Sequence, residues 1–138
     1  MPRRDVHITV VLGDGPNVDN TWDAGIAVAA DGNDTFGMLK GKVASDGDNI
    51  VGWTIRSQES GDVVTLRTMV DGTMYVKVVI IDPNQFVGDE LYLTDDGSGR
   101  LTDVTPGVAR EIGIALEENK VTGDFMEALI ITQKYITT

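Results

Sequence analysis

The sequence contains no cysteine and a single histidine among its 138 residues. Without cysteine there is no disulfide framework and no thiolate chemistry. One histidine, His7, cannot build a zinc site that needs three or four His and Cys ligands. His7 is also the only base available to a Ser-His-Asp arrangement, and it lies in a β-branched run beside no serine. We therefore interpret His7 as an ordinary strand residue and predict no catalytic, metal or cofactor site, and hence no enzyme.

Positive charge and long apolar runs are also scarce. No segment approaches the roughly 20 apolar residues that cross a membrane, and the run after the first four residues is too short and too charged for a secretory signal. Lys and Arg number 11 against 22 Asp and Glu, so the formal net charge is -11. An acidic chain is poorly suited to phosphate backbones. We expect a soluble protein made in a cytoplasm, with neither nucleic acid nor membrane as a partner.

Glycine, by contrast, is abundant, with 16 residues. Short β-branched runs separated by Asp-Gly and Gly-Asp steps predict an all-β fold. The firmest local prediction is a hairpin at Asp71-Gly72, followed by a strand whose continuous apolar end indicates burial on both faces. A single helical turn is predicted at residues 105–110. Strands are expected over residues 6–12, 26–29, 35–39, 50–57, 63–70, 74–81, 90–94, 112–117 and 127–136.

The pattern of glycines and apolar residues occurs twice. The repeated segments are residues 26–32 with 91–97, 50–55 with 111–116, and 61–62 with 123–124. Two such units predict a compact β-barrel or sandwich with pseudo-repeated meander halves. The length suits one domain. We divide the chain into an amino-terminal arm with the first strand, residues 1–12, and a single β domain, residues 13–138.

The many carboxylates raise two further possibilities. The loops at residues 46–49 and 95–99 look superficially like calcium loops, but neither has the full ligand series with a terminal glutamate. Hairpin turns favour Asp and Gly at these same places, so we interpret both loops as turns. An acid-based hydrolase would need two carboxylates at a set separation, which the sequence does not place.

The two tryptophans have different surroundings. Trp53 lies in an apolar run between Ile50 and Ile55, which indicates a core residue. Trp22 lies beside Asn20 and Asp23 in a polar loop. This setting favours Trp22 as part of a contact surface or as a platform on which a sugar stacks.

The order of motifs in the chain resembles the tailed-phage capsid cement or decoration proteins. That family is similar in having a "G-D-x-L-Y" strand, a turn, "L-T", and an "I-G-x-A" strand. The sequence has Gly88-Asp89-Glu90-Leu91-Tyr92, then Leu101-Thr102, then Ile112-Gly113-Ile114-Ala115, before Gly123-Asp124 and a last apolar strand. Segments at residues 24–28, 50–52 and 60–66 also look similar, so that the resemblance covers residues 24–131.

The resemblance implies a structural virion protein with no cofactor, located on the outer capsid surface. Its partner would be the major capsid protein, whose neighbouring subunits it would cement. A virion-surface or tail-associated carbohydrate-binding module is the alternative. Whether the free protein is a monomer, a dimer or a trimer stays open.

The amino-terminal arm has two interpretations. Arg3 and Arg4 stand out in an acidic chain, and the strand at residues 6–12 lies outside the duplicated units. The strand could pair with the sheet edge of a neighbouring molecule, or it could complete its own barrel. The candidate capsid-contact residues are Arg3, Arg4, Val6, Ile8, Val10 and Trp22.

Overall fold

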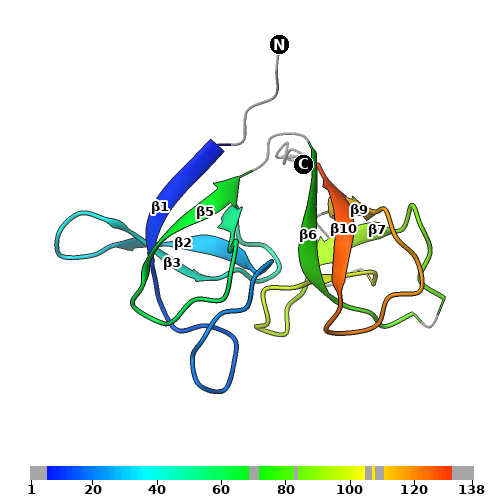
Figure 1. The fold of residues 1–138 in the computed structure, drawn as a ribbon, viewed down its shortest axis with the longest axis horizontal. Coiled ribbons are helices and arrows are strands. Elements are labelled where there is room, and N and C mark those ends of the chain that lie inside the picture. Colours follow the sequence, from blue (N-terminus) through cyan, green and yellow to red (C-terminus); the bar gives the residue numbers. More distant parts are fainter. Residues whose placement is uncertain (1–5, 69–71, 83, 105–106, 108–110, 132–138) are drawn as a thin grey trace, which may run out of the picture.

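The computed structural model describes residues 6–68, 72–82, 84–104, 107 and 111–131. It shows two closed five-stranded barrels that follow one another along the chain (Figure 1). The first barrel contains β1 (Val6–Leu12), β2 (Ala27–Asn33), β3 (Leu39–Val43), β4 (Ile50–Trp53) and β5 (Val63–Thr68). The second contains β6 (Gly72–Val79), β7 (Glu90–Leu93), β8 (Leu101–Thr102), β9 (Glu111–Ala115) and β10 (Phe125–Ile130).

The prediction of an all-β fold is confirmed, since the part of the chain that the structure describes forms strands and connections without helix. The helical turn predicted at residues 105–110 lies outside the described residues, apart from Gly107. Strand β1 pairs with β3 and β5 of its own chain, so this segment completes its own barrel. Pairing with a neighbour's sheet edge is therefore not needed to satisfy its backbone.

The two barrels have the same strand topology, which confirms the predicted duplication. In the first barrel β1 is parallel to β3 and antiparallel to β5, and in the second β6 is parallel to β8 and antiparallel to β10. The embedded glycines are equivalent, because Gly52 lies opposite Val28 and Gly113 lies opposite Leu91. In both barrels the register shifts directly after this pair.

The two Gly-Asp pairs are also equivalent, and each closes the first strand of its barrel onto the last. The amide of Leu12 donates to the carbonyl of Asp62 at 2.9 Å, and the amide of Val78 donates to the carbonyl of Asp124 at 3.2 Å. In return Gly61 donates to Leu12 at 2.8 Å and Gly123 donates to Val78 at 2.9 Å.

One part of the predicted superposition is wrong by two residues. The sequence match placed Ile26 over Leu91, whereas the registers make Val28 of the first barrel equivalent to Leu91 of the second. The error arose because the match was fixed by two Asp-Gly steps, at residues 31–32 and 96–97. The first step lies within β2, at its register irregularity, and the second lies in the β7–β8 connection, so the two are not equivalent. Short apolar runs carry little register information of their own.

The predicted hairpin at Asp71-Gly72 is wrong. Strand β5 pairs with β1 and β4, whereas β6 pairs with β8 and β10, so the two strands belong to different barrels. Each barrel closes by pairing its first strand with its last, which leaves the β5–β6 connection as the link between barrels. The expected burial of the end of this strand on both faces is also wrong, because Val78 is buried but Val79 is half-buried and Ile81, just beyond the strand, is 63% exposed.

Two short elements differ from the prediction. The strand predicted at residues 35–39 is wrong, because residues 35–37 form a turn and the next strand, β3, begins only at Leu39. The two-residue strand β8 was not predicted, because two residues are too few to show a period.

The barrels share part of their core. One cluster fills the first barrel and contains Val10, Leu12, Trp22, Ile26, Val28, Val64 and Leu66. The other fills the second barrel and also takes in Ala27, Ala29, Ala44 and Trp53 from the first. The prediction that Trp53 is a core residue is confirmed, because its side chain is 5% exposed.

Backbone hydrogen bonds run directly between the barrels. The amide of Ala27 donates to the carbonyl of Gly99 at 2.9 Å, and the amide of Asp46 donates to the carbonyl of Thr94 at 2.9 Å. The β7–β8 connection thus lies against the first barrel. Shared core and direct hydrogen bonds together indicate one rigid unit.

Candidate functional site

The contact residues predicted in the first strand do not form an outward apolar face. Val10 is fully buried, and Ile8 packs partly buried against the same cluster. The backbone of Val6 pairs with Thr68, while Arg3 and Arg4 lie outside the described residues. A role for the basic arm stays a prediction.

The prediction that Trp22 forms an exposed contact surface is wrong. The side chain is fully buried in the core of the first barrel, and its Nε1 donates to the carbonyl of Gly13 at 2.9 Å. The amide and carbonyl of Trp22 also pair with Gln58. The polar neighbours misled the prediction, because they lie on a loop whose one large apolar residue turns inward.

The two acidic loops use their carboxylates to hold turns. Asp48 Oδ2 accepts from the amide of Ser45 at 3.0 Å. Asp96 Oδ1 accepts from the amide of Ser98 at 2.9 Å and from Thr94 Oγ1 at 2.7 Å. Burial alone would raise the pKa of Asp96, but these hydrogen bonds outweigh it and lower the pKa.

Two kinds of feature are absent from the described residues. These residues contain no group of three or more His, Asp or Glu side chains that could hold a metal ion. They also contain no helix that is long and apolar enough to cross a membrane.

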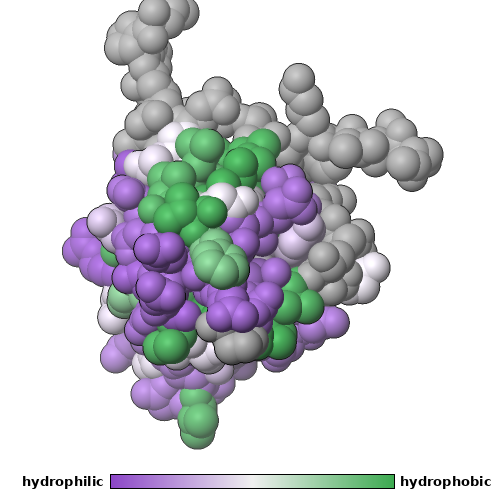
Figure 2. All heavy atoms as spheres, turned by 90° about the vertical axis from the view of Figure 1, so that its right-hand side faces the viewer, coloured by the Kyte–Doolittle hydropathy of each residue, from purple (hydrophilic) through white to green (hydrophobic). Residues whose placement is uncertain are grey.

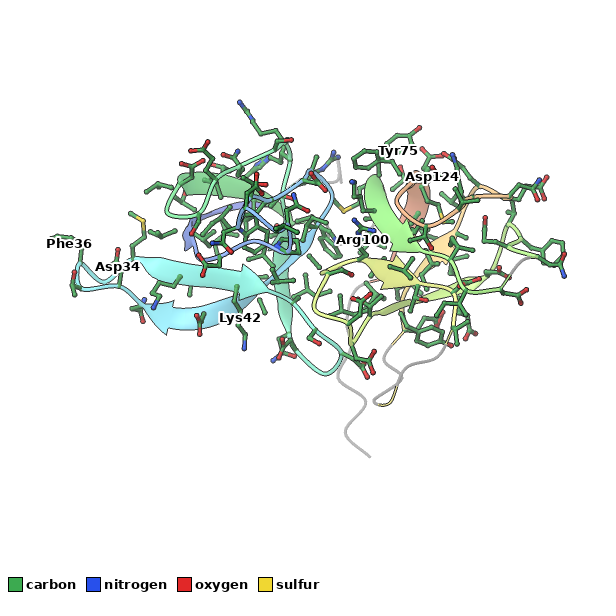
Figure 3. All side chains as sticks on the ribbon, turned by 90° about the horizontal axis from the view of Figure 1, so that it is seen from below. Asp34, Phe36, Lys42, Tyr75, Arg100 and Asp124 are labelled. Carbon is green, nitrogen blue, oxygen red and sulfur yellow. The ribbon has the colours of Figure 1, made fainter. Side chains whose placement is uncertain are left out.

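Exposed apolar side chains occur in several places, and two of these places lie at opposite ends of the molecule. One end is the hairpin tip between β2 and β3, where Phe36 is 93% exposed and points away from both barrels (Figure 3). Sequence reasoning missed Phe36 by assigning it to a strand. The signal was present as Asp34-Thr35-Phe36-Gly37, because Asp at the first position and Gly at the fourth favour a type I turn.

The other end is formed by the β6–β7 and β9–β10 connections of the second barrel. We call it the distal apolar patch. Its exposed members are Ile81, Phe86, Val87 and Val121. Figure 2 shows apolar side chains collected on this face among hydrophilic ones.

A buried amide supports the distal apolar patch from beneath. The side chain of Gln85 is 1% exposed, and its Nε2 donates to the carbonyls of Phe86 at 2.9 Å and Glu117 at 2.8 Å. Its Oε1 accepts from the amide of Lys120 at 2.9 Å. Gln85 thereby links the β6–β7 connection to the β9–β10 connection through hydrogen bonds.

A small cavity of about 180 Å³ lies between the barrels. Its lining includes Ile55, Arg67, Met74, Tyr75 and Phe125. The volume is below the roughly 300 Å³ at which small-molecule pockets begin, which suits the cavity to a side chain better than to a cofactor.

Comparisons with known proteins give one informative result. No protein-family model matches the chain, and no curated protein matches it. A solved structure does match. It is described as the crystal structure of the head fiber gp8.5 N base in bacteriophage phi29, and it aligns with a TM-score of 0.69 at 17% identity. The alignment covers 96% of this chain and 98% of that chain, so the likeness in fold extends over both barrels.

Proposed function

We propose that this chain is a structural virion protein without enzymatic activity, which binds the outer surface of an assembled phage capsid and cements neighbouring major capsid protein subunits. The observation that carries the proposal is the near full-length likeness in fold to the base of a phage head fiber. The order of the "G-D-x-L-Y", "L-T" and "I-G-x-A" motifs supports the same class of protein.

The distribution of exposed apolar residues supports the cementing role. Phe36 and the distal apolar patch lie at opposite ends of the long axis, so one molecule offers contacts in two directions (Figure 1). A ligand that holds two subunits gains effective concentration for the second contact once the first has formed. Because it binds only the assembled shell in this way, it stabilises that state by mass action.

The carbohydrate-binding alternative rested on Trp22, and the structure does not support that role. Trp22 was the candidate for a sugar-stacking platform, and its indole is buried in the core. The described residues supply no other exposed tryptophan, since Trp53 is also buried.

The test uses purified protein and expanded heads that lack it. We expect saturable binding and a higher melting temperature of the shell, whereas an unrelated acidic protein of similar size should do neither. Binding should persist at moderate salt, because apolar contacts are not screened. Failure to bind, or binding that leaves the melting of the shell unchanged, contradicts the cementing role. Binding to a glycan array in place of heads would support the carbohydrate-binding alternative.

A further inference from the structure

The tip of the β2–β3 hairpin displays an aromatic side chain that the rest of the molecule does not use. Phe36 is 93% exposed, and a phenylalanine buries 150–250 Å² when it enters a protein interior. Single exposed apolar residues are common and need no explanation alone. Phe36 differs because the hairpin is built to hold it in place.

The backbone of the tip is fixed by one carboxylate and by backbone pairing. Asp34 Oδ1 accepts from the amides of Phe36 and Met38, both at 2.9 Å. The amide of Asp34 donates to Met38 at 2.8 Å, and the amide of Gly37 donates to Asp34 at 3.1 Å. Gly37 has a φ of 82°, which closes the turn at little cost only for glycine. The backbone that carries Phe36 thus has little conformational entropy left to lose on binding.

The β2–β3 hairpin carries two lysines and two aspartates, so its formal charge is near zero although the chain as a whole is acidic. On β3 the side chain of Lys40 is half-buried and that of Lys42 is exposed, and Figure 3 shows Lys42 on the flank of the hairpin. Among the described residues the lysines in ion pairs are Lys77 and Lys120. In a chain of net charge -11, a hairpin of near-zero charge is repelled by an acidic protein surface less than the rest of the molecule is, and its two lysines can pair with carboxylates there.

We propose that the β2–β3 hairpin is the anchor by which this protein attaches to the shell: Phe36 enters an apolar recess on the assembled capsid, and Lys40 and Lys42 face carboxylates at its rim. The inference rests on the proposed function, because the recess belongs to the shell. A buried aromatic ringed by weaker polar contacts is the arrangement in which a few residues carry most of the binding energy.

The test compares hairpin variants for binding to expanded heads. Phe36→Ala should weaken the Kd by about 10- to 100-fold. The control is Val18→Ala, an equally exposed apolar residue on a different loop of the same barrel, which should bind like the wild type. Neither substitution should change the melting temperature of the free protein.

Three further variants distinguish the role of the turn backbone from that of the side chains that contact the shell. Asp34→Ala removes the acceptor that orders the turn and should weaken binding although Phe36 is intact, whereas Asp34→Asn keeps an acceptor oxygen and should retain most of it. Replacing Lys40 and Lys42 by Ala should lower the association rate and flatten its dependence on salt.

Each outcome is decisive. If the wild type binds heads and Phe36→Ala binds equally well, the anchor is wrong and the proposed function stands. If the wild type binds no heads, both are wrong. If Phe36→Ala alters self-association in sedimentation and leaves head binding unchanged, the hairpin contacts a second copy of this chain, and the shell is not its partner.

Discussion

The ammonium group of Lys77 lies 2.9 Å from the carboxylate Oδ2 of Asp23, and this ion pair joins the second barrel to the first. Lys77 is on β6, and Asp23 is in the connection that precedes β2. Asp23 Oδ1 also accepts from Asn17 Nδ2 at 3.3 Å. The Lys77 ammonium lies 5.4 Å from the centre of the Phe125 ring. One cation thus contacts both an acid of the first barrel and an aromatic ring of the second.

This pair predicts an acid-sensitive contribution to stability. The hydrogen bond from Lys77 lowers the pKa of Asp23 below its ordinary value of 3.8. A carboxyl with a depressed pKa stabilises the fold above its unfolded-state pKa, and the contribution is lost as the pH falls through the folded-state pKa. Because the pair is partly exposed, Asp23→Asn should lower the free energy of unfolding by only about 0.5–1 kcal/mol at neutral pH.

Urea unfolding at neutral pH and in acid tests this, since the difference between wild type and variant should shrink as the pH falls through the folded-state pKa of Asp23. Asp31→Asn, on the exposed part of β2, is the control and should have little effect at either pH. An equal loss for Asp23→Asn at both pH values would show that the carboxylate charge contributes nothing.

The docking of the barrels depends on a glycine. A Cβ at Gly99 would lie 2.6 Å from Ile26 Cγ2 and 2.9 Å from Val43 Cγ1, and its φ of +67° disfavours any side chain. Gly97, in the same connection, has a φ of +81° with open space around it. Gly99→Ala should therefore destabilise by about 2–4 kcal/mol and Gly97→Ala by only about 1 kcal/mol. Thermal unfolding measures both, and equal losses would mean that the contact with Ile26 is unimportant.

The arrangement of the distal apolar patch should depend on Gln85. Gln85→Met keeps the size of the side chain but leaves the carbonyls of Phe86 and Glu117 and the amide of Lys120 without this partner. We expect a loss of about 2–4 kcal/mol, because unpaired buried polar groups are costly. Hydrogen exchange of the two connections should rise more than that of the barrel strands. Uniformly faster exchange would contradict a local role for Gln85.

The all-β class and the duplication could be predicted because both depend on features that repeat along the sequence. Glycines such as Gly52 and Gly113 are fixed by close packing in equivalent strand pairs, and the Gly-Asp closures repeat the same backbone hydrogen bonds. Which strands pair could not be predicted. Asp71-Gly72 has the composition of a hairpin, but the closure of each barrel on its own last strand overrides this local preference.

The candidate site was predicted less well than the fold. Burial of Trp22 depends on how its loop folds over the barrel, which the polar neighbours in the sequence do not reveal. Phe36 was placed in a strand because an aromatic beside Thr35 is typical of one. The carboxylate of Asp34 and the positive φ of Gly37 decide otherwise, and these are short-range features that a turn pattern could have identified.

The two buried tryptophans predict a measurable difference between otherwise identical substitutions. Trp22 Nε1 is hydrogen bonded to Gly13, whereas Trp53 Nε1 is buried with no partner in the described structure. Replacing either by Phe removes similar volume, but only Trp22→Phe leaves a partly buried carbonyl without its donor. Trp22→Phe should therefore destabilise by about 1 kcal/mol more than Trp53→Phe. Trp22→Ala should cost about 3–5 kcal/mol through the cavity it leaves.

The same variants test whether Trp22 has any role beyond packing. Because its indole does not reach the surface, head binding by Trp22→Phe should equal that of the wild type wherever the variant is folded. Binding measured well below the melting temperature, with the folded fraction set by circular dichroism, separates the two effects. If fully folded Trp22→Phe loses binding, the loop must open to expose position 22. Trp22 would then again be a candidate platform for a sugar.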